Sequence, residues 1–174
     1  MFSGASSGDS IILNIKRLVN YTIEIEAIPT GTLLVPSSVN TQNMAVLRLQ
    51  GLVKPGNKYA VRDRIVLDTS DSVQYLFSGY CVNFNKDNPS ESTVFTMNGL
   101  ADANVIKIFN VLNQPSENVT KIAAIQTAVF AVTDNVSRSE LQSRFSATAT
   151  DIQNAKTILE KAGIDTTNKR LFTE

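Results

Sequence analysis

The hydrophobic pattern of this chain changes its period once, near residue 100, and this change constrains the fold more than any other feature. Before it, short apolar or alternating runs are separated by turn residues, as in 21–28 (YTIEIEAI). After it, apolar residues recur every three or four positions, as in 102–114 (DANVIKIFNVLNQ). The first pattern is typical of strands and the second of amphipathic helices. Strands followed by helices predict an α+β fold whose two parts are segregated.

Six stretches in the first hundred residues are strand candidates: 10–18, 21–28, 33–35, 44–53, 58–68 and 72–84. The segments PTGT (Pro29 to Thr32) and KPGN (Lys54 to Asn57) carry the proline and glycine that turns require. Short strands at this spacing predict an N-terminal antiparallel β-sandwich or barrel.

Four helices are expected in the remainder. The first covers 102–114, with Val105, Ile108, Phe109 and Leu112 on one face. Pro115 and Ser116 begin the second, which runs to about Asn135, with Ser116 as its N-cap. The third and fourth cover 138–145 and 149–163. In the fourth, Thr150 or Asp151 lies near the start and Gly163 ends the helix.

The chain is therefore expected to be one domain over 1–174, mainly β in 1–100 and mainly α in 101–165, with the helices as a small C-terminal subdomain. Residues 164–174 are assigned no element.

Composition removes several classes of function. The chain has no histidine, which excludes Ser-His-Asp and Cys-His catalysis and removes the commonest metal ligand. A single cysteine, Cys81, cannot form an internal disulfide or a multi-cysteine zinc site. Lys plus Arg and Asp plus Glu number 16 each, and the basic residues are scattered, so no nucleic-acid partner is expected. No cofactor and no metal is predicted.

The sequence contains no apolar run near the roughly 20 residues that span a bilayer, so membrane insertion is not expected. The first ten residues, MFSGASSGDS, have neither the basic nor the apolar region of a secretion signal. Two locations stay open: the cytoplasm, or the cell surface as a domain of a longer exported protein.

Two residues stand out by their setting. Cys81 ends the last long strand candidate, where it meets the polar loop NFNKDNPS. Gln126 lies inside the apolar helix IAAIQTAVFAVTDN, on the same face as Ile122, Val129 and Phe130. Taken singly, Cys81 reads as a small core residue and Gln126 as an amide satisfied by a backbone carbonyl.

Taken together, the two residues suggest one chemistry. A cysteine thiol held against a glutamine carboxamide can expel ammonia and form an internal thioester. That bond requires neither histidine nor metal, and burial protects it from water until a nucleophile enters.

The segments YCVNF (80–84) and IQTAVFAVTDN (125–135) resemble the thioester domains of bacterial surface adhesins, in which an aromatic residue or leucine precedes the cysteine and TQxA(I/V)W supplies the glutamine. Gln126, Ala128 and Val129 match that motif, whereas Ile125 replaces threonine and Phe130 replaces tryptophan. The further glutamine motif that the family often carries between the two has no counterpart here.

The resemblance implies a covalent adhesion module. An amine on a surface protein or another target attacks the Cys81–Gln126 thioester, leaving an amide to Gln126 and a thiol on Cys81. This acyl transfer is a single turnover, so the protein is not expected to be an enzyme. Tyr80 or Thr127 is the expected donor to the tetrahedral intermediate, and Phe130 lies near the site.

Three other interpretations were weighed. In the first, the chain is a non-covalent structural or ligand-binding module with Cys81 and Gln126 as core residues. In the second, Cys81 is an enzyme nucleophile, but the sequence offers no base to activate it. In the third, the loop 86–95 binds calcium, although it lacks the ligand spacing of an EF-hand.

Overall fold

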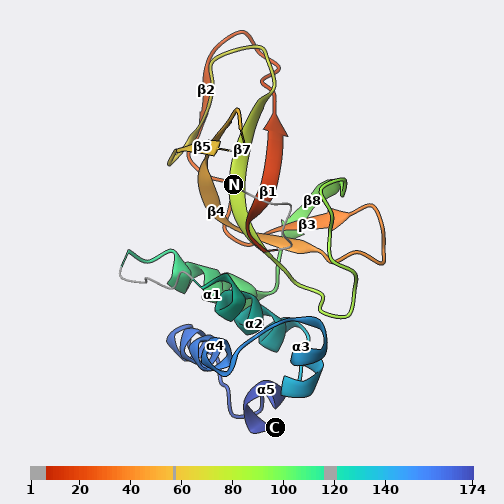
Figure 1. The fold of residues 1–174 in the computed structure, drawn as a ribbon. Coiled ribbons are helices and arrows are strands. Elements are labelled where there is room, and N and C mark those ends of the chain that lie inside the picture. The colour runs from red at the N-terminus through yellow and green to blue at the C-terminus, as the bar shows by residue number, and fades with distance from the viewer. Residues whose placement is uncertain (1–6, 57, 116–120) are drawn as a thin grey trace.

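The computed structural model describes residues 7–56, 58–115 and 121–174 and confirms the α+β class (Figure 1). Eight strands come first: β1 (Ser7–Ile15), β2 (Ile23–Ile25), β3 (Thr32–Pro36), β4 (Met44–Lys54), β5 (Lys58–Val61), β6 (Ile65–Leu67), β7 (Val73–Cys81) and β8 (Phe95–Leu100). Five helices follow: α1 (Ala103–Leu112), α2 (Ile122–Thr133), α3 (Arg138–Arg144), α4 (Ala149–Lys161) and α5 (Arg170–Thr173). The strands gather at one end of the molecule and the helices at the other.

The main sheet is antiparallel, with the order β1-β7-β4-β3-β8 and with β5 paired to β4. Its centre is the pair β4 and β7, in which Met44 lies opposite Cys81. The long strand β4 therefore bonds β7 along one edge. Along its other edge, β3 pairs with its first residues and β5 with its last.

The predicted strand 58–68 is two strands. The chain leaves β5 at Val61, bends through 62–64 and continues as β6, which pairs with β2 in a separate two-stranded sheet. Tyr75 of β7 joins the two sheets, because its buried hydroxyl accepts from the backbone N–H of Val66 at 2.8 Å and donates to the Val66 carbonyl at 3.0 Å. The sequence pattern does not reveal this division, because a strand can change its pairing partner without any change in the alternation of apolar residues.

Helix α2 is buried on all sides over residues 124–131, and it contacts α1, α4, β7 and β1. This explains its composition, since a helix packed on every face has no polar stripe. The predicted N-cap Ser116 lies outside the described residues. As described, α2 begins at Ile122, and the side chain of its N-cap Lys121 makes no capping hydrogen bond.

Helices α3 and α4 begin with capping boxes. Ser137 caps α3 with Glu140 as its partner, and Thr148 caps α4 with Asp151 as its partner. The predicted start of α4 at residue 149 is confirmed, and the residue that caps it is Thr148. Gly163 follows the C-cap in a left-handed conformation with φ 66°, and the Gly163 and Ile164 N–H groups bond the Glu160 and Leu159 carbonyls as in a Schellman motif.

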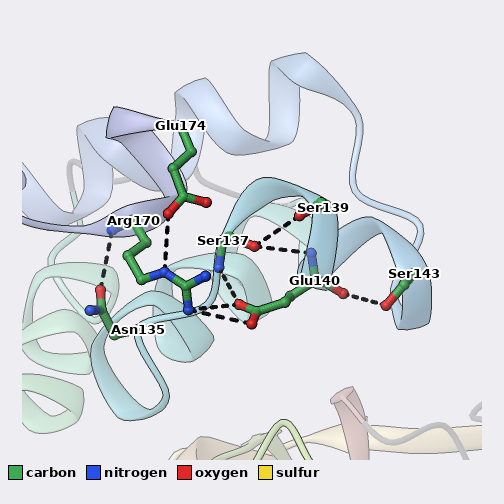
Figure 2. Close-up of polar contacts among 7 residues, drawn as sticks. All are labelled: Asn135, Ser137, Ser139, Glu140, Ser143, Arg170 and Glu174. Carbon is green, nitrogen blue, oxygen red and sulfur yellow. Dashed lines mark hydrogen bonds and ion pairs between the residues drawn. The ribbon is translucent and has the colours of Figure 1, made fainter.

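The C-terminal segment adds one short helix that the sequence pattern did not predict. Figure 2 shows how α5 is attached: Arg170 donates to Glu140 at 3.0 Å and to Glu174 at 3.1 Å, and its backbone N–H donates to Asn135 Oδ1. Asn135, at φ 50°, turns the chain out of α2. Leu171 is fully buried beneath this network.

Candidate functional site at the junction of sheet and helices

Cys81 is the last residue of β7, at the point where the sheet meets the helical part. It lies on the central strand pair opposite Met44, and its side chain is part of the core with 1% exposure. The backbone N–H of the next residue, Val82, donates to the Asn43 carbonyl. The backbone that carries Cys81 is therefore fixed on the side of β4.

Gln126 reaches Cys81 from the first half of α2. The Cys81 backbone N–H donates to Gln126 Oε1 at 3.0 Å, and Gln126 Nε2 donates to the Cys81 carbonyl at 2.8 Å. Gln126 is 2% exposed, so both bonds are shielded from water. Because one partner only donates and the other only accepts, the pair also fixes which end of the carboxamide is oxygen.

The structure thus brings together the two residues singled out from the sequence, although they are 45 positions apart. Both hydrogen bonds go to the residue that carries the thiol. The carboxamide of Gln126 is satisfied by these two bonds to the Cys81 backbone. The arrangement suits a hydrogen-bonded core amide, and it brings the carboxamide to the one residue of the chain that carries a thiol.

The oxygen of the Gln126 amide already has a donor in place. An oxyanion that forms at Oε1 when a nucleophile adds to the amide carbon meets the Cys81 N–H at hydrogen-bond distance. From the sequence, this role is expected of Tyr80 or Thr127. A backbone N–H carries no sequence signal, so the sequence could not point to this contact.

Tyr80 and Thr127, the chain neighbours of Cys81 and Gln126, are both buried. The Tyr80 ring packs against Phe109 with centroids 5.9 Å apart. Burial raises the pKa of Tyr80 well above its ordinary value, and the charge of Asp9 adds to this effect while Arg48 opposes it. Thr127 is fully buried, and within the described part of the chain its hydroxyl has no hydrogen-bond partner.

Phe130, one turn after Gln126, belongs to an aromatic cluster. Its ring meets Phe84 edge-on at 5.0 Å and Phe145 edge-on at 6.1 Å. Phe84 follows β7 and Phe145 follows α3, so the cluster ties three parts of the chain together beside Gln126. Phe130 thus lies one turn from Gln126 on the same helix.

A cavity of about 190 Å³ lies against Gln126. Its lining includes Gln42, Phe84, Asp87, Gln126, Phe130 and Arg144. It is lined by the three rings of the aromatic cluster and by polar residues such as Asp87 from the segment after β7 (residues 82–88). Gln126 thus lies between Cys81 and this cavity.

Two residues that sequence analysis missed hold the segment after β7 in place. Gln42 Nε2 donates to the Lys86 carbonyl at 3.1 Å and to Asn88 Oδ1 at 2.9 Å. Arg144 donates to the carbonyls of Phe84 at 3.1 Å and Lys86 at 3.3 Å. Gln42 is 3% exposed, and no partner for its Oε1 occurs among the described residues.

In the loop considered for calcium, 86–95, polar side chains make hydrogen bonds both within the loop and to Gln42. Asn88 Oδ1 accepts from Gln42 Nε2, and Ser90 bonds Ser92 and Thr93. Over the ranges that the structure describes, no group of three or more His, Cys, Asp or Glu side chains is placed to hold a metal ion. Those ranges also contain no helix with the length and hydropathy that a membrane crossing needs.

Comparisons of the chain with protein-family models, with curated proteins and with solved structures gave no match.

Proposed function

We propose that this protein attaches covalently to an amine-bearing target through a thioester between Cys81 and Gln126. The observation that carries the proposal is the pair of buried hydrogen bonds between the Gln126 carboxamide and the backbone of Cys81, the only cysteine in the chain. Such a module serves adhesion, and the proposed setting is the cell surface, with this chain as one domain of a longer protein.

The bond forms by an exchange within the buried pair. Cys81 Sγ adds to Cδ of Gln126, the C–N bond breaks, and the amide nitrogen leaves as ammonia with the thiol proton. The Cys81 N–H stabilises the charge that develops on Oε1. The low exposure of both residues then slows hydrolysis of the product.

Attachment reverses the roles of the two side chains. A neutral primary amine enters by the cavity and adds to Cδ of Gln126, after which the C–S bond breaks. The amine loses a proton to the departing sulfur, so Gln126 ends in an amide to the target and Cys81 ends as a thiol. The reaction runs once and needs no metal or redox partner.

Intact mass tests the proposal directly. Fresh protein is expected to weigh about 17 Da less than its sequence requires, the mass of ammonia, and methylamine is expected to add about 31 Da. Cys81→Ala is the matched control, since it keeps Gln126 and both backbone hydrogen bonds but has no thiol. Full mass in the wild type, with no methylamine adduct, refutes the thioester.

A non-covalent structural or binding module is the second candidate. It is favoured by the same hydrogen bonds, because they satisfy both ends of the Gln126 amide without any reaction. This candidate predicts a full-mass protein with one titratable thiol.

A further inference from the structure

Arg144 fastens the segment after β7 to the helical part, at the edge of the cavity beside Gln126. As the last residue of α3, it bonds the carbonyls of Phe84 and Lys86, and its guanidinium lies over the Phe84 ring at 5.6 Å. Three interactions therefore converge on residues 84–86, two with the backbone and one with the Phe84 ring. Arg144 itself is exposed, so it forms the outer rim of the cavity.

The position of Phe84 determines the space next to Gln126. Phe84 is buried and meets Phe130 edge-on, and Phe130 lies four residues after Gln126 on α2. A residue one turn away on a helix shares the same face. Any outward movement of Phe84 consequently widens the cavity where it adjoins Gln126.

The segment after β7 is held from two sides that differ in strength. Gln42 and Arg144 both donate to the Lys86 carbonyl, but Gln42 is buried and Arg144 is exposed. Hydrogen bonds of an exposed side chain exchange readily with water, whereas breaking those of a buried amide leaves polar groups without partners. Opening the segment on the side of Arg144 therefore costs less free energy than opening it on the side of Gln42.

We infer that Arg144 is a positioning residue that selects nucleophiles by size, admitting unbranched primary amines to the Gln126 carbonyl and excluding branched ones. The inference rests on the proposed thioester. Arg144 acts through Phe84 and takes no part in bond making, so its removal changes selectivity more than it changes the intrinsic reactivity of the bond.

The test compares the rates at which the thioester is lost to water, to methylamine and to isopropylamine, followed by intact mass. Arg144→Ala is expected to raise the isopropylamine rate about tenfold, equivalent to about 1.4 kcal/mol. Water and methylamine are expected to enter the wild-type cavity as well, so their rates should stay within about twofold of the wild-type rates. Arg138→Ala, at the other end of α3, is the matched control and should behave as the wild type. Arg144→Lys keeps the charge but cannot bridge the two carbonyls as a fork, and it should lie in between.

The outcomes separate the two proposals. If the wild type carries the bond and Arg144→Ala leaves all three rates unchanged, or raises them equally, the selection by Arg144 is refuted while the thioester stands. If the wild type shows full mass, the thioester fails and the selection fails with it. If Arg144→Ala is isolated with its bond already hydrolysed, the three rates are compared between Arg144→Lys and the wild type. Rates that are unchanged, or raised equally, then refute the selection.

Discussion

A covalent link between Cys81 and Gln126 should make a large and specific contribution to stability. Cross-linking two residues that are 45 positions apart restricts the unfolded chain, and the loop-entropy relation gives about 4 kcal/mol for a loop of this length. For a chain of this size, that difference corresponds to a shift in melting temperature of about 10 °C. The expectation follows from the loop length alone and does not depend on strain in the bond.

Cys81→Ala isolates this term because both hydrogen bonds of Gln126 go to the backbone of Cys81. Without a cross-link, the substitution costs about 1 kcal/mol, the usual cost of deleting one buried heavy atom. With a cross-link, the cost rises to about 5 kcal/mol, the sum of the two terms. Gln126→Met removes the hydrogen bonds as well, so it should be less stable than Cys81→Ala in either case.

Thermal and urea unfolding at a pH near 6, where amines are protonated and hydrolysis is slow, provide the measurement. Wild type treated with methylamine is the best control, because it loses the cross-link with no change of sequence. Its melting temperature should fall by most of the difference seen with Cys81→Ala. The reasoning fails if Cys81→Ala lies within about 1.5 kcal/mol of untreated wild type and methylamine has no effect.

Two further predictions concern the helical part. The pKa of Glu140 is lowered, first by the hydrogen bond from the Ser137 backbone N–H and also by Arg170. Its stabilising effect is therefore complete above the ordinary value of 4.5 and disappears as the pH falls through the lowered folded-state pKa. Melting temperatures from pH 6 to 3 should drop less steeply in Glu140→Gln than in the wild type or in the control Glu160→Gln, and parallel curves contradict the assignment. Gly163→Ala should cost about 1–2 kcal/mol in urea unfolding, because φ is 66° and the added Cβ meets no atom within 4 Å, so the whole cost is backbone strain. Gly163→Asn, which tolerates this conformation, should cost clearly less; equal losses contradict the strain argument.

The sequence predicted those parts of the fold that local chemistry determines. The helix around Gln126, the apolar face of α1 and the left-handed Gly163 follow from period and from the conformational freedom of glycine. It did not predict α5, because four residues are too few to show a period and no side chain caps its start. That helix depends on Arg170 and its contact with Glu140, which comes from a distant helix.

The residues of the candidate site also fall into two groups, those that the sequence indicated and those that it did not. Cys81 and Gln126 stand out because each is unusual in its local sequence, and this is visible without a structure. Gln42 and Arg144 are ordinary polar residues in polar segments, so nothing in their neighbourhood distinguishes them. They become significant only where β-sheet connections and α3 meet around the carbonyls of Phe84 and Lys86.

The absence of histidine bears on how a bond between Cys81 and Gln126 would form. An enzyme that turns over many times needs a base poised to take the thiol proton, but a reaction that happens once per molecule does not. The departing nitrogen of Gln126 is itself the acceptor for that proton, and the Cys81 N–H supplies the donor that the carbonyl oxygen requires. Reacting groups that a fold holds in good alignment gain effective molarities of about 10⁵–10⁸ M. Under the proposed function, proximity takes the place of general-base catalysis. The two buried hydrogen bonds that satisfy the Gln126 amide in the core also hold it at Cys81.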